Sequence, residues 1–228
     1  MTNLSKERRE KRFLATDGRI MSRRQYNIAL CGTLLYGLLI NFLICARYGD
    51  TAARVNPLVF FVGYFVCALA GCMMSACSNN PVVSFIGYNL VVVPSGFIVS
   101  MAVQEYGGLG SEVVTQAFLI TLLVTAAMTL LAVASPEFCS RIGSVLFGAL
   151  IGLIIAEVIL MLIGRANIAI SWISAAIFSM YIAYDVWRSQ QFPPTMDNAI
   201  DSALDIYLDI INLFIDLLEI FGNKSSKD

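Results

Sequence analysis

The sequence contains no histidine and few charged residues. Asp, Glu, Lys and Arg make up 14% of its 228 residues, whereas a soluble domain carries about 25%. The absence of histidine removes the side chain that most often changes charge near neutral pH and the commonest metal ligand. Any pH sensing must therefore come from carboxylates with shifted pKa values.

The six cysteines form no CxxC pair. We interpret them as buried, reduced thiols and not as a metal site or a disulfide framework. The sequence also shows no nucleophile–base arrangement and no metal-ligand spacing. We therefore expect neither an enzyme nor a bound cofactor.

Hydrophobic residues, in contrast, make up 58% of the chain. This composition predicts an all-α, polytopic membrane protein, because each transmembrane helix needs about 20 apolar residues. We predict seven helices, at about residues 26–46, 57–76, 82–103, 113–134, 142–163, 167–187 and 198–222. Residues 25–222 would then form one seven-helix transmembrane domain, and residues 223–228 a short C-terminal tail.

Three local patterns refine this prediction. Pro94, inside the third segment, predicts a kink or local unwinding. Residues 135–137 (Ser-Pro-Glu) predict a short interfacial turn before the fifth segment. That segment carries small residues at four-residue spacing, which predict a face for close helix packing: Ser144, Gly148, Gly152 and Ala156.

Residues 1–24 form a basic tail with eight Lys or Arg and three acidic residues. Such a tail can bind anionic lipid or nucleic acid, but we favour the interpretation that it holds the N-terminus in the cytosol. We expect no nucleic-acid partner. No small-residue cleavage site follows the tail cleanly, so we expect the first helix to be an uncleaved membrane anchor.

The last apolar segment carries a stripe of acidic side chains. Five carboxylates and one amide fall within an arc of about 80° on a helix: Asp201, Asp205, Asp209, Asn212, Asp216 and Glu219. Because a carboxylate in lipid costs several kcal/mol, this stripe must face protein, water or a cation. The stripe predicts an ion path, and its structural alternative is a set of acids capped by Ser, Tyr and backbone groups.

Two further acids lie on other segments. Glu157 lies in the fifth segment with no basic residue near it in the sequence. It is either protonated and satisfied by a neighbouring hydroxyl group or part of a cation path. Asp185 lies at the end of the sixth segment, three residues before Arg188. An ion pair between these two residues is the simplest explanation of both charges.

In the predicted topology Asp185 and Asp209 lie near the cytosolic surface on adjacent helices. If they approach closely, they cannot both ionise cheaply and would titrate as a coupled pair. Their oxygen ligands suit Ca²⁺ better than soft metals, so we expect calcium ions, together with the lipid bilayer, as partners.

Two motifs carry a family resemblance. FSMYIAYD at residues 178–185 and ALDIYLDIINLF at residues 203–214 resemble signatures of the Bax inhibitor family (transmembrane Bax-inhibitor-motif proteins). The resemblance implies a seven-helix bundle with the last helix central, in the inner membrane of a bacterium. It also implies a pH-sensitive calcium leak in which Asp185 and Asp209 form the pH-sensing pair.

The chain departs from the family pattern at its cytosolic end. Its second segment has neither the family's glutamate nor a basic cluster, and no Lys or Arg occurs between Arg54 and Arg141. Asp205 stands where the family usually has an uncharged residue. Arg188 is the one basic residue near the aspartate pair in the sequence. The missing basic cluster and the added Asp205 both make this end of the protein more acidic.

Two functions remain open at this point. The first is a cation leak, selective for calcium and gated by protonation of the aspartate pair. The alternative is a non-conducting membrane regulator that binds a partner such as a membrane protease.

Overall fold

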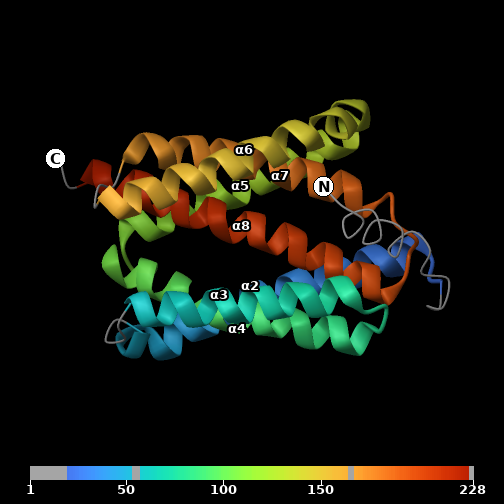
Figure 1. Cartoon of the computed structure of the whole chain (residues 1–228), viewed down its shortest axis with the longest axis horizontal. Coiled ribbons are helices and arrows are strands. Elements are labelled where there is room, and N and C mark those ends of the chain that lie inside the picture. Colours follow the sequence, from blue (N-terminus) through green and yellow to red (C-terminus); the bar gives the residue numbers. More distant parts are fainter. Residues whose placement is uncertain (1–19, 53–56, 164–166, 226–228) are drawn as a thin grey trace. The chain divides into compact units, whose positions relative to one another are not determined.

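The computed structural model describes residues 20–52, 57–163 and 167–225, and these residues form helices joined by short connections (Figure 1). Seven helices follow one another: α2 (Arg23–Ala52), α3 (Pro57–Cys77), α4 (Pro81–Glu105), α5 (Glu112–Ala134), α6 (Pro136–Ile163), α7 (Ile168–Ser189) and α8 (Met196–Ser225). The predicted all-α class and the number of helices are confirmed. Residues 1–19 of the basic tail and residues 226–228 of the C-terminal tail lie outside the described residues.

Five of these helices are long and apolar enough to cross a membrane: α2, α4, α5, α6 and α7. The described apolar part of α3 is shorter, at Gly63–Cys77. The apolar residues of α8 are interspersed with carboxylates, but this helix contains more buried side chains than any other. The protein is therefore an integral membrane protein whose last helix is the most enclosed, as predicted.

Helical geometry continues through Pro94 and begins again at Pro136, so the local unwinding and the three-residue turn predicted there are wrong. Helix α4 continues without unwinding through Pro94, and the Ser95 hydroxyl donates a hydrogen bond to the Val92 carbonyl, 2.9 Å away, inside the same turn. Helix α6 begins at Pro136, directly after Ser135, where we expected an interfacial turn. Proline suits the first position of a helix, because its missing N–H would have no partner there.

The described chain divides into two compact units. The first comprises the described part of residues 1–101 together with residues 189–207, and so contains α2, α3, most of α4 and the beginning of α8. Within it, α3 and α4 approach closely at two glycines. A Cβ atom at Gly71 would lie 2.5 Å from the Gly87 carbonyl oxygen, and one at Gly87 would lie 2.6 Å from the Gly71 oxygen. Only glycine allows the two backbones to come this near.

The second unit comprises the described part of residues 102–188 and 208–228, which includes α5, α6, α7 and the remainder of α8. Here Gly143 of α6 lets the Tyr184 ring of α7 lie against the helix backbone, since a Cβ atom would meet Cε2 of that ring at 2.6 Å. The predicted packing face of α6 is uncovered at two of its four residues. Gly148 and Gly152 are exposed and have no described atom within 4 Å of a Cβ position.

Candidate functional site

The acidic stripe of α8 begins one turn earlier than the sequence suggested. Helix α8 starts at Met196 and includes Asp197, which is buried. Sequence analysis missed Asp197 because it placed the helix start at residue 198. The signal was available, since Asp197, Asp201, Asp205 and Asp209 follow one another at four-residue intervals.

In the first unit, serine hydroxyl groups contact the beginning of this stripe. The Ser84 hydroxyl of α4 donates a hydrogen bond to Asp197 Oδ1, 2.6 Å away. The Ser75 hydroxyl of α3 donates to Asp201 Oδ1. Both serines and both aspartates are buried, whereas Asp205 is half-buried. No sequence pattern distinguishes these two serines, because single serines are common in apolar helices.

The same unit contains a polar contact deeper along α8. The Tyr207 hydroxyl lies at hydrogen-bond distance from Ser95 of α4 and accepts a hydrogen bond from the side-chain amide of Asn41 of α2. Tyr207 is fully buried, and Asn41 is 4% exposed. This contact ties α8 to α2 and α4 without any charged group.

In the second unit, the charges of Asp185 of α7 and Asp209 of α8 both act on one tyrosine, Tyr181. Their side chains are 8% and 6% exposed, and both carboxylates act electrostatically on the Tyr181 hydroxyl. Arg188 Nη1 lies 3.6 Å from Asp185 Oδ1, which confirms the ion pair expected from the sequence spacing. The Arg188 guanidinium also lies 5.9 Å from the centroid of the Tyr184 ring. One cation and two buried carboxylates thus share a small region.

A second acidic group lies further along α8 in the same unit. Asp216 is buried, hydrogen-bonds to Ser174 of α7, and interacts electrostatically with Glu219 and with Glu157 of α6. Its Oδ2 atom has no hydrogen-bond partner among the described residues. Glu157 is exposed and faces the charge of Glu219. The structure therefore brings three of the predicted path residues together.

The end of this group contacts a tyrosine outside the membrane-spanning helices. Tyr106 follows the last residue of α4, and Gly222 leaves room for its ring against α8. Burial raises the pKa of the Tyr106 phenol, and the negative charges of Glu105 and Glu219 raise it further. Asn212, the amide of the stripe, is half-buried between the two acidic groups along α8.

These groups do not form a dedicated metal cage within the described residues. No three Asp, Glu or Cys side chains in that part of the chain are placed to hold one metal ion. Two carboxylates offer at most about four oxygen atoms, whereas Ca²⁺ takes about six to eight.

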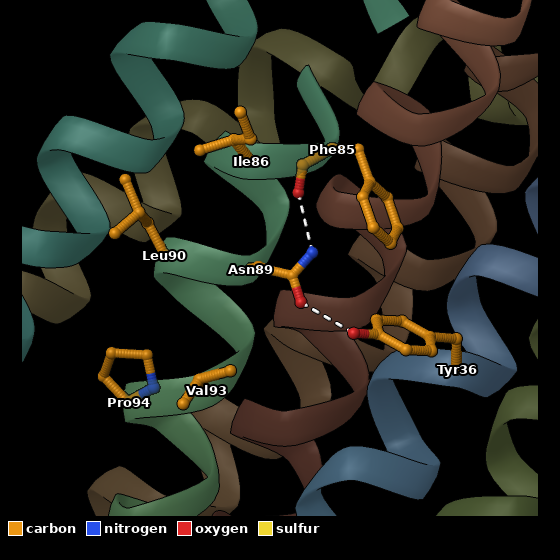
Figure 2. Close-up of a pocket in the computed structure, with 7 residues that line it drawn as sticks. All are labelled: Tyr36, Phe85, Ile86, Asn89, Leu90, Val93 and Pro94. Atoms are coloured by element: carbon orange, nitrogen blue, oxygen red, sulfur yellow. Dashed lines mark hydrogen bonds between the residues drawn. The ribbon is translucent and has the colours of Figure 1, made fainter. Parts of the chain in front are cut away.

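A separate groove of about 580 Å³ lies on the first unit and contains no carboxylate (Figure 2). Its one polar feature is a pair of hydrogen bonds. The Tyr36 hydroxyl donates to Asn89 Oδ1 at 2.8 Å, and the Asn89 amide donates to the Phe85 carbonyl at 2.8 Å (Figure 2). The remaining lining is apolar: Ile86, Leu90, Val93 and Pro94. This groove is not part of the acidic site.

Comparison with known proteins gives one family and several relatives. The sequence model of the family described as "Inhibitor of apoptosis-promoting Bax1" matches residues 18–226. An uncharacterized protein of Helicobacter pylori is 36% identical over 124 residues, 53% of this chain and 52% of that protein. An uncharacterized membrane protein of Streptococcus pyogenes is 37% identical over 138 residues, 57% of this chain and 59% of its own length. The chain thus matches little more than half the length of these relatives.

A fourth comparison covers almost the whole chain. The inner membrane protein YbhL of Escherichia coli is 26% identical over 236 residues, which include 93% of this chain and 99% of that protein.

Proposed function

Because this chain belongs to the Bax inhibitor family of membrane proteins, we propose that it is a pH-sensitive leak for calcium ions, gated by Asp185 and Asp209. We place it in the inner membrane of a bacterium with its N-terminus in the cytosol, and we propose no enzymatic activity. The relative named as an inner membrane protein supports the proposed membrane. The basic tail supports the proposed orientation.

The observation that carries this proposal is the grouping of two buried carboxylates around Tyr181, with Arg188 beside one of them. Two nearby carboxylates in a partly dry site oppose each other's ionisation, so they bind and release one proton as a coupled pair. Arg188 adds a positive charge 3.6 Å from Asp185. This arrangement suits a switch that responds to pH.

The gate would work through that shared proton. At lower pH one proton bridges Asp185 and Asp209, and α7 and α8 are held together. At higher pH the proton leaves, the two negative charges repel each other, and the oxygen atoms become free to take up a passing cation. A difference of one pKa unit between the two states corresponds to about 1.4 kcal/mol, which changes their ratio about tenfold.

The other acids of α8 would extend the path along the same helix. Asp201 and Asp205 lie on the cytosolic side of the pair in the proposed orientation, and Asn212 lies deeper. Beyond it, the group of Asp216, Glu219 and Glu157 offers negative charge from two helices. Charged side chains inside a membrane protein commonly mark such ion pathways.

The proposal is tested by calcium flux in liposomes. The purified protein is reconstituted with a calcium dye inside, and influx is measured from about pH 6 to pH 8, the range where a coupled carboxylate pair is expected to titrate. For the wild type we expect influx to rise with pH. Asp209→Asn keeps the shape of the side chain but removes the shared proton, so the pH dependence should flatten while some flux remains.

Glu137→Gln serves as the matched control, because Glu137 is an exposed acid at the start of α6, in its first turn. Its pH profile should follow the wild type. An unchanged profile in Asp185→Asn, Asp209→Asn and the double variant would remove the pair as the sensor. Liposomes that admit no calcium at any pH would remove the leak itself.

One observation favours the alternative, a non-conducting regulator that binds a membrane partner such as a protease. Helix α6 is exposed along most of its length, and Gly148 and Gly152 leave its backbone uncovered by the described chain. Small residues at this spacing allow another helix to pack closely. Absence of calcium flux in the wild type would favour this function.

A further inference from the structure

The groove beside Asn89 lies within the hydrocarbon layer of the membrane. Helix α4 runs from Pro81 to Glu105 and is long enough to cross a bilayer, so its middle residue, Val93, lies near the bilayer centre. Asn89 precedes Val93 by four residues, which is about 6 Å of helix. Tyr36, which lines the same groove from α2, is at the middle of the membrane-crossing part of that helix. The groove therefore faces acyl chains and not headgroups.

At this depth the hydrogen-bonding capacity of Asn89 is only partly used. Its side-chain amide donates one hydrogen bond to the Phe85 carbonyl and accepts one from the Tyr36 hydroxyl (Figure 2). An Asn side chain has two N–H groups, and the second has no acceptor within the described part of the chain. The Tyr36 oxygen gives its own proton to Asn89 but keeps lone pairs that accept. One donor and one acceptor thus remain at the groove.

A hydroxyl group matches this remaining donor and acceptor. It accepts a hydrogen bond from the Asn89 N–H and donates its own proton to the Tyr36 oxygen. In hydrocarbon no water supplies these bonds, so a polar group without a partner is unfavourable on the protein and on a lipid alike. Pairing the two removes both penalties. No charged side chain lines the groove, so it offers no ion pair to a phosphate or carboxylate headgroup.

The depth of Asn89 indicates where on a lipid this hydroxyl group lies. The hydrocarbon core is about 30 Å thick, so each leaflet is about 15 Å deep and one acyl chain spans it. Asn89 is about 6 Å from the centre and hence about 9 Å below the boundary with the headgroups. That depth corresponds to the middle of an acyl chain. The volume of the groove, about 580 Å³, is within the range of about 300–1,000 Å³ for small-molecule sites.

We propose that the groove between α2 and α4 binds an acyl chain that carries a hydroxyl group near its middle. The ligand is one chain of a membrane lipid, and its headgroup lies outside the groove. Asn89 and Tyr36 hold the hydroxyl group, while the apolar part of the lining contacts the chain. The groove contains no carboxylate, so this site does not depend on the proposed calcium leak.

Binding is measured by native mass spectrometry of the full-length protein released from nanodiscs. In separate samples the discs contain a phosphatidylcholine whose stearoyl chain is plain, hydroxylated at its middle, or hydroxylated beside its carbonyl group. We expect the mid-chain hydroxylated lipid to be retained about threefold to tenfold more than the plain lipid, the effect of one or two hydrogen bonds in a membrane. The lipid hydroxylated beside its carbonyl group should be retained like the plain lipid, because its hydroxyl group lies near the headgroups.

Two variants test whether the lipid occupies this groove. Asn89→Leu removes the donor and should abolish the preference for the mid-chain hydroxyl group. Leucine suits a lipid-facing helix, so this variant should fold, and its Tm checks that it does. Ile86→Leu changes an apolar lining residue without altering any hydrogen bond. It should keep the preference of the wild type.

Four results would overturn the proposal. The first is equal retention of the three lipids by the wild type. The second is an equal preference for both hydroxylated lipids, since the hydroxyl group would then be recognised near the membrane surface. The third is a preference that persists in Asn89→Leu, because the lipid would then bind elsewhere. The fourth is a dimer without bound lipid, which would show that a second copy of this chain covers the groove.

Discussion

Replacing Gly71 with alanine tests whether the close contact of α3 and α4 sets the geometry around Asp197 and Asp201 at the start of α8. A Cβ atom at residue 71 would lie 2.5 Å from the Gly87 carbonyl oxygen and 2.8 Å from a methyl carbon of Val91. The first of these is backbone and cannot rotate away, so the two helices must separate. Ser75 lies one turn after Gly71 and Ser84 one turn before Gly87, so separation also draws both hydroxyl groups from their carboxylates.

The magnitude follows from two opposing effects. Overpacking of a tight contact costs about 1–3 kcal/mol, while alanine gains up to about 1 kcal/mol over glycine in a helix. Gly63→Ala makes the same substitution in the same helix at a position with no described atom within 4 Å of a Cβ. Gly63→Ala therefore keeps only the gain in helix propensity and has no overpacking cost. We expect Gly71→Ala to be less stable than Gly63→Ala by about 1–3 kcal/mol.

Thermal unfolding in detergent, followed with a thiol-reactive dye, measures this difference. The buried thiols of Cys45 and Cys139 report loss of the fold as they become accessible. For a chain of this size, the expected difference corresponds to a Tm lower by about 2–12 °C in Gly71→Ala than in Gly63→Ala. Equal Tm values for the two variants would show that α3 and α4 do not pack at these glycines and would refute the reasoning.

Two further predictions concern single side chains. Ser84→Ala removes the hydroxyl that donates to buried Asp197 and should reduce the free energy of unfolding by about 1.5–3 kcal/mol; Ser140→Ala, whose exposed hydroxyl bonds only a backbone carbonyl in its own helix turn, should change it by less than about 0.5 kcal/mol. The raised pKa of Tyr106 means that the folded protein holds this proton more tightly than the unfolded chain. Its stabilising effect is therefore complete below the ordinary tyrosine pKa near 10 and is lost as the pH rises beyond it. Tyr106→Phe should show a shallower loss of Tm above about pH 10, and an identical alkaline slope in both proteins would contradict this account.

Much of the architecture was predictable because it depends on local composition. Long apolar segments require helices in a bilayer, since every backbone polar group must be satisfied within the segment. The acidic stripe followed from a spacing of three and four residues, and the Asp185–Arg188 ion pair from a spacing of three. These features involve residues within one or two turns of each other, so a linear sequence displays them directly.

Only the tertiary structure decided which distant residues contact each other. Ser75 and Ser84 precede their partners Asp201 and Asp197 by more than 100 residues, and their role depends on the approach of α3 to α4 at two glycines. Gly148 and Gly152 have the same small-residue character but are uncovered in the described chain. A glycine in a sequence permits close packing without specifying whether a neighbour is present. Whether a neighbour is present depends on how the apolar faces of all the helices pack together. No single segment contains that information.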